Sequence, residues 1–277
     1  MIRTTLAATK AATFCIYLPN PAQKNLPLPA GTGFFVSPEG WFVTAAHVLT
    51  EGRAPLGQLP CDLGPALLSK EAESGGFPQV LLNPRLVHLD PQNDFALLKV
   101  DLTNQGNPPW LAGVTSFAYV EISTRRISDG EPVYAFGYPL PQWQEIVPRS
   151  PLLPSLVDPQ GMPLPVTNVL LCPRTTEAIL SARVEGPGPM QAGGAIVRYV
   201  IDKALNFGNS GGPIVATETG KVFALCTAFQ PMAIVQRHLG PNPIPIMIPS
   251  LYGVVSSLSV QAIIDVLRQN GIPISQE

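Results

Sequence analysis

Short apolar runs separated by turn signals dominate this sequence, and they constrain the fold more than any other feature. About a dozen runs of strand length carry β-branched or aromatic residues, as in residues 33–37, 95–102 and 221–229. Segments such as Ser37–Trp41 and Thr217–Lys221 carry the residues of tight turns. The pattern predicts an all-β protein, and a dozen short strands suit two small barrels better than one sandwich.

Only residues 257–273 show convincing helix signals. The apolar residues in this stretch recur on one face of a helix: Val260, Ile263, Ile264 and Leu267. Ser259 is the expected N-cap, and Gly271 followed by Pro273 is expected to stop the helix. The chain is therefore predicted to end in one α-helix that follows the strands.

The chain has 32 prolines, and they are most concentrated near residues 19–29, 139–165 and 231–249. Proline lacks the backbone N–H and fixes φ, so it is excluded from central strands and from helix interiors. These three segments are predicted to be long connections between structured runs.

Composition excludes several classes of protein and favours others. Charged residues make up 13% of the chain and the formal net charge is -2, which is unlike the basic surface that nucleic-acid binding needs. No stretch has the roughly 18 consecutive apolar residues of a membrane span. At the N-terminus Lys10 interrupts the apolar residues, and residues 11–18 resemble a strand more than a signal peptide. A cytoplasmic location is therefore expected.

The four cysteines are scattered along the chain and form no Cys-x-x-Cys pair: Cys15, Cys61, Cys172 and Cys226. This spacing argues against a zinc site, and we expect neither a metal nor another cofactor. Reduced thiols are the first expectation for an unexported chain, and a disulfide is the second.

Residues 206–215, NFGNSGGPIV, surround one serine with three glycines and a proline. These residue types are frequent in turns, so a structural turn is one interpretation. The other is that the backbone bends to present Ser210 beside converging N–H groups, which is how a nucleophile lies next to an oxyanion hole. The segment alone does not decide between the two.

A serine nucleophile needs a base and an acid that orients the base. Of the three histidines, His47 follows an apolar run and two small alanines, which leaves room around its ring. His88 lies within a predicted strand and His238 within a proline-rich segment, where structural and surface roles are expected. Asp94 precedes an apolar run and is the candidate acid, while a role as a turn residue or cap is open to both Asp90 and Asp94.

Taken together, four segments in this order resemble the trypsin-like serine proteases, and specifically their HtrA/DegP-like bacterial branch. The segments are GTGFFVSPEGWFVTAAHVL at 31–49, DPQNDFALLKV at 90–100, GEPVYAFGYP at 130–139 and VIDKALNFGNSGGPIV at 200–215. The resemblance covers most of residues 11–271 and leaves out proline-rich insertions near 140–175 and 230–250.

The resemblance implies a chymotrypsin-like double barrel. Two six-stranded antiparallel β-barrels would pack around a cleft, with a C-terminal α-helix. The first barrel would comprise residues 1–125, the second residues 126–258 with both insertions, and the helix and tail residues 259–277. No PDZ module is expected after the helix.

The resemblance also implies roles for individual residues. His47 matches the general base, Asp94 the orienting acid and Ser210 the nucleophile, while Gly208 and Ser210 match the oxyanion-hole donors. Thr227 would begin the strand that pairs with the substrate backbone, and Phe207 could cover the oxyanion hole at rest. The complete set of expected substrate-binding residues is Ala204, Leu205, Phe207, Thr227, Ala228, Phe229, Val254 and Val255.

The predicted function is that of a serine endopeptidase, an intracellular bacterial enzyme of regulation or quality control. Ala204 at the base of the specificity pocket offers no acid for a basic side chain, so an apolar P1 residue is expected. The expected partners are a protein or peptide substrate and a regulatory protein that docks on the proline-rich loops. The alternatives are a catalytically silent binding module with this fold, or a serine hydrolase of esters. GNSGG fits Gly-x-Ser-x-Gly, but the order His, Asp, Ser is not that of an α/β-hydrolase.

Overall fold

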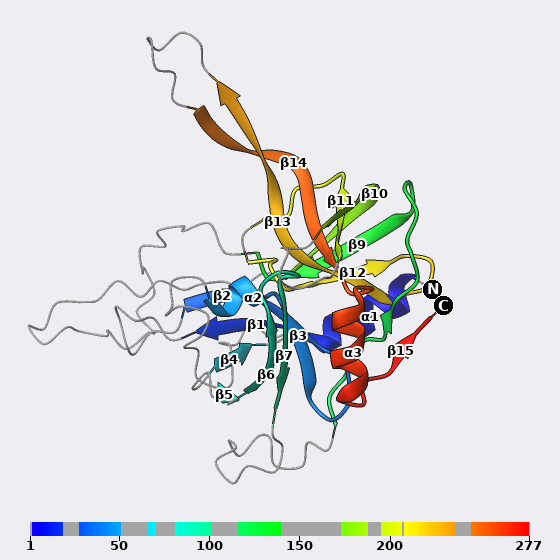
Figure 1. Cartoon of the computed structure of the whole chain (residues 1–277). Coiled ribbons are helices and arrows are strands. Elements are labelled where there is room, and N and C mark those ends of the chain that lie inside the picture. The colour runs from blue at the N-terminus through cyan, green and yellow to red at the C-terminus, as the bar shows by residue number, and fades with distance from the viewer. Residues whose placement is uncertain are drawn as a thin grey trace, which may run out of the picture.

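The computed structural model describes ten segments of the chain, and all structural statements below refer to them. They are residues 2–18, 28–50, 66–69, 81–82, 84–100, 116–139, 173–187, 195–206, 208–235 and 245–276. Two β-sheets form the body, and helices lie against them (Figure 1). The predicted all-β class with a C-terminal helix is confirmed.

The first sheet is antiparallel and has the order β5-β4-β1-β2-β3-β7-β6. Its strands are β1 (Thr13–Leu18), β2 (Leu28–Phe35), β3 (Trp41–Thr44), β4 (Ala66–Ser69), β5 (Leu81–Leu82), β6 (Arg85–Asp90) and β7 (Phe95–Lys99). The predicted turn at Ser37–Trp41 joins β2 to β3, and the short helix α2 (Ala46–Thr50) follows β3. Phe14, Phe35 and Phe42 pack against one another in the core of this sheet.

The second sheet closes into the six-stranded antiparallel barrel that was expected, with the cyclic order β12-β9-β10-β11-β14-β13. Its strands are β9 (Pro132–Gly137), β10 (Arg174–Pro187), β11 (Ala195–Ile201), β12 (Pro213–Ala216), β13 (Val222–Val235) and β14 (Pro245–Ser257). Strands β8 (Ile122–Ser123) and β15 (Ile274–Ser275) join it in parallel register. The first sheet shows no such closing pair within the described segments. The predicted domain boundaries stay a prediction.

One apolar core joins the two sheets and the C-terminal helix. It contains Phe34 and Leu97 from the first sheet, Leu225 from the second and Leu267 from α3 (Gln261–Gln269), all of which are inaccessible to solvent. The predicted apolar face of α3 is buried. The expected N-cap, Ser259, was wrong: the N-cap is Val260, which has no polar side-chain group, and the Ser259 hydroxyl bonds the hydroxyl of Ser257. Gly271 follows the helix with φ +71°, as expected for a helix stop.

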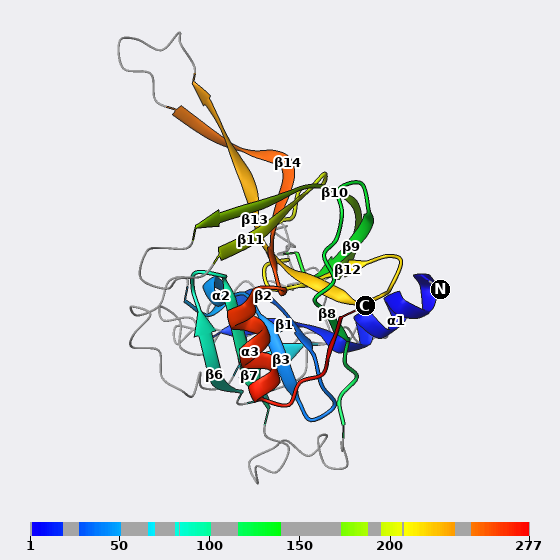
Figure 2. The ribbon, with the colours of Figure 1, turned by 45° about the vertical axis from the view of Figure 1, so that its right-hand side comes forward.

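The sequence patterns missed helix α1 (Ile2–Ala12), which precedes β1 but packs on the second sheet (Figure 2). The buried hydroxyl of Thr9 is 3.1 Å from that of Tyr134 on β9, and Gly220 lies directly against Thr5. Residues 13–18, however, form the expected strand β1. None of the described helices combines the length and hydrophobicity that a membrane-spanning helix needs.

The third proline-rich segment differs from its prediction as a loop. Residues 231–235 of β13 pair with residues 245–249 of β14, and Pro231 lies opposite Pro249. The pair extends from the barrel as a two-stranded ribbon (Figure 1). Proline is tolerated in this ribbon because each of its two strands has one unpaired side, where no backbone N–H is needed for a hydrogen bond. Residues 19–27, 140–172 and 236–244 lie outside the described segments.

Candidate active site

His47 and Asp94 meet because their strands are neighbours. His47 lies on α2 just after β3, Asp94 just before β7, and Thr44 of β3 is in register with Ala96 of β7. The Asp94 carboxylate lies 2.8 and 2.9 Å from His47 Nδ1, and it also accepts the His47 backbone N–H at 2.9 Å. With the proton on Nδ1, the other ring nitrogen carries the lone pair and can act as a base.

The structure assigns different roles to Asp90 and Asp94, both of which the sequence allowed as turn or cap residues. Asp90 shapes the turn before β7, since its carboxylate accepts the backbone N–H groups of Gln92 and Asn93 and the Asn93 amide. Asp94 is buried and has φ +53°, a left-handed conformation that aspartate tolerates better than most residues. Asp90 therefore holds the turn and Asp94 faces the histidine.

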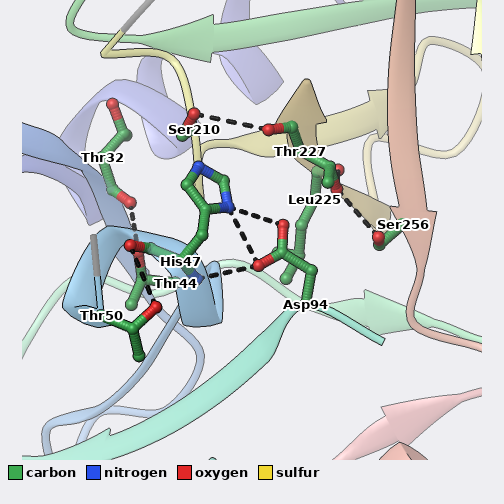
Figure 3. A network of polar contacts seen from close by, with 9 residues as sticks. All are labelled: Thr32, Thr44, His47, Thr50, Asp94, Ser210, Leu225, Thr227 and Ser256. Carbon is green, nitrogen blue, oxygen red and sulfur yellow. Dashed lines mark hydrogen bonds and ion pairs between the residues drawn. The ribbon is translucent and has the colours of Figure 1, made fainter. Parts of the chain in front are cut away.

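Ser210 lies across the His47 ring from Asp94, and the ring nitrogen that does not bond the carboxylate is turned toward it (Figure 3). Its hydroxyl points toward the carbonyl oxygen of Thr227, 3.5 Å away. The serine loop is fixed by backbone bonds: Gly211 N–H donates to Cys226 at 2.7 Å, and Cys226 N–H donates to Gly212 at 2.9 Å. The structure thus brings together the three residues whose types suit nucleophilic catalysis.

The glycines around Ser210 are required by backbone geometry and by space. Gly208 has φ +91° and Gly211 has φ +81°. A Cβ on Gly211 would collide with the hydroxyl of Thr44 and the carbonyl of Thr32. Among the described residues no acceptor binds the N–H of Gly208 or of Ser210, so both amides are available to a ligand oxygen.

The expected substrate-binding residues fall into two groups by burial. Leu205 and Val255 lie in the core of the second barrel, while Ala204 and Val254 are partly exposed. Leu205 packs directly against Gly253, since a Cβ there would lie 2.8 Å from Leu205 Cγ.

The expected substrate-pairing segment needs one correction. Thr227 lies inside β13, which begins at Val222, because the strand continues from the turn at Thr217–Lys221. Its hydroxyl donates to Ser256 at 2.8 Å. The backbones of Ala228 and Phe229 follow on the same strand, opposite Val254 and Gly253, and Phe207 lies outside the described segments.

Two of the cysteines are free and buried, Cys15 and Cys226. Burial without charged partners strongly raises the pKa of both thiols, so neither is suited to act as a nucleophile or a metal ligand. Within the described segments no three His, Cys, Asp or Glu side chains gather in a way that could hold a metal ion.

Residues 31–225 match the trypsin-like peptidase domain family. The chain belongs to this family. The predicted enzyme class, a trypsin-like serine protease, is thereby confirmed. The fold agrees, since this trypsin-like peptidase is similar to the HtrA-type protease AlgW in complex with a decapeptide, with TM-score 0.56 and 17% identity over 97% of this chain and 67% of that one. It is also similar to the active form of the Rv3671c protease of M. tuberculosis, with TM-score 0.51 and 18% identity over 99% and 86% of the two chains.

Two curated relatives are longer proteins. A probable periplasmic serine endoprotease, DegP-like, of Bartonella henselae is 27% identical over 75% of this chain and 31% of its own length. An uncharacterised protein, y4bJ, of Sinorhizobium fredii is 33% identical over 44% of this chain and 15% of its own length. This chain thus spans less than a third of either relative. The resemblance to the HtrA/DegP-like branch is confirmed, but the predicted cytoplasmic location is contradicted, because the DegP-like relative is a periplasmic protein.

Proposed function

We propose that this trypsin-like peptidase is an endopeptidase that cleaves protein or peptide substrates through an acyl-enzyme on Ser210. The observation that carries the proposal is the buried carboxylate of Asp94, 2.8 Å from His47 Nδ1, with Ser210 on the other side of the ring. A hydroxyl in this setting has the base it needs, and the base has its orienting acid.

In the proposed reaction His47 Nε2 takes the proton of Ser210 as its Oγ attacks the substrate carbonyl carbon. Asp94 holds the proton on Nδ1 and stabilises the imidazolium that forms. The C–N bond then breaks, and His47 gives the proton to the leaving amine. Water attacks the acyl-enzyme by the same route and releases the acid, so that Ser210 regains its proton. The free amides of Gly208 and Ser210 would stabilise the negative oxygen in both halves.

The substrate backbone would pair with β13 on the side of Thr227, whose carbonyl already faces Ser210. Ala204 offers no charge, and Leu205 fills the space beside Gly253. A small or medium apolar P1 residue therefore fits best. A role in regulation or protein quality control, with a regulatory protein on the proline-rich segments, remains part of the proposal.

Replacing Leu205 by alanine should shift the preference toward larger P1 residues. Removing three heavy atoms beside Gly253 makes room, so the ratio of kcat/KM for P1 Phe over P1 Ala should rise about tenfold. Leu180→Ala is the matched control, because Leu180 lies in the same core cluster. It should lose stability without changing this ratio, and an equal ratio in both variants would refute the role of Leu205.

An active-site serine probe tests the proposed function directly. A fluorophosphonate should label the native protein once, and peptide mapping should place the label on Ser210. The competing functions predict other results: a silent binding module would not be labelled, and an ester hydrolase would be labelled but would leave unfolded casein intact. Labelling together with casein cleavage is the expected result.

A further inference from the structure

Thr32 on β2 is a buried polar residue that connects the first sheet to the serine loop. Its backbone N–H donates to the Ser210 carbonyl at 2.8 Å, and its own carbonyl accepts the Thr44 hydroxyl at 2.7 Å. Its hydroxyl donates to the Gly208 carbonyl at 2.6 Å and accepts the Tyr138 N–H at 3.0 Å. All of its polar groups are therefore engaged, and two of them hold the serine loop.

The peptide groups of the serine loop have different anchors. The Asn209 carbonyl accepts the Gly212 N–H, and the Ser210 carbonyl accepts the Thr32 N–H. These are backbone bonds that a side-chain substitution leaves in place. The Gly208 carbonyl depends on the Thr32 hydroxyl, which within the described segments is the one side-chain group that bonds a carbonyl of residues 208–211.

From this arrangement we infer that the Thr32 hydroxyl is a positioning group for the oxyanion hole. Gly208 lacks a Cβ and has φ +91°, so rotation of its peptide groups meets little steric resistance. The Gly208 carbonyl lies in the 208–209 peptide, so its bond to Thr32 restricts ψ of Gly208 and fixes the position of its Cα, from which the N–H of the preceding peptide extends. The inference rests on the proposed function, in which this N–H receives the negative oxygen.

Thr32→Val tests the inference, because it keeps the shape of the side chain and removes the hydroxyl. Per active site titrated with a fluorophosphonate, kcat for a chromogenic peptide should fall about 10- to 100-fold while KM changes less than about threefold. The affinity of a peptide boronate, which places an oxygen in the hole, should fall by the same factor. Thr32→Ser keeps the hydroxyl and should stay within about threefold of the wild type.

Thr13→Val is the matched control, since Thr13 is equally buried and its hydroxyl also donates to one backbone carbonyl, that of Thr9. It should lower the melting temperature without changing kcat. Should T32V fail to fold, Thr32→Cys, which keeps a weak donor of similar size, replaces it. Wild-type kcat in the variant that lacks the hydroxyl, or an equal loss in T32S or T13V, would overturn the inference. All of these variants keep Ser210 and can still be labelled by the fluorophosphonate. Failure of the inference therefore differs from failure of the proposed function, in which the wild type itself would not be labelled.

Discussion

Ser210→Ala should lower peptide hydrolysis by about 10⁵- to 10⁶-fold and leave the fold intact. The hydroxyl is the proposed nucleophile, and an alanine at this position cannot form the acyl-enzyme. The loop itself is held by the backbone bonds of Ser210, Gly211 and Gly212. The measurement is kcat/KM for a chromogenic peptide, together with the melting temperature and the far-UV circular dichroism spectrum.

Ser128→Ala provides the control for that experiment, because it removes an exposed serine hydroxyl that is distant in sequence from Ser210. It should retain wild-type turnover. Equal hydrolysis by the wild type and by the variant at position 210 would show that the nucleophile has been assigned wrongly.

Asp94→Asn should cost about 10⁴-fold in kcat. Both carboxylate oxygens lie against His47 Nδ1, and one also accepts the backbone N–H of His47. When the asparagine amide oxygen accepts the backbone N–H of His47, its NH₂ group faces Nδ1 of the His47 ring. The ring would then carry its proton on Nε2 and could not accept one from Ser210.

Asp90→Asn separates the two aspartates. Asp90 bonds the turn and not the ring, so this substitution should reduce stability modestly and leave kcat within about twofold. A comparable loss of kcat at both positions would contradict the assignment of Asp94 as the acid.

The sequence was most informative where local patterns and chemistry coincide. The short apolar runs predicted the strands, and the period of residues 257–273 predicted α3 with its buried face. The order of His47, Asp94 and Ser210 gave a candidate site whose members the fold brings together. Asp94 was the candidate acid, but the approach of its carboxylate to His47 depends on the register of β3 with β7, which no local pattern contains.

What the sequence did not reveal depends on contacts between distant residues. Helix α1 has a weak pattern of its own and is stabilised by its docking on the second sheet. Pairing with β14 made the proline-rich part of β13 a strand. Thr32 was visible within GTGFF, but only the fold places its hydroxyl on a carbonyl 176 positions later in the chain.

The docking of α1 has a consequence for how this protein assembles. The hydroxyl of Thr9 meets that of Tyr134, and 125 positions separate the two residues in sequence. Such a distant contact forms only after the chain between them has been brought into place, which makes it slow to form. A fluorescent reporter attached to this helix would therefore follow the joining of the two halves rather than the formation of either one.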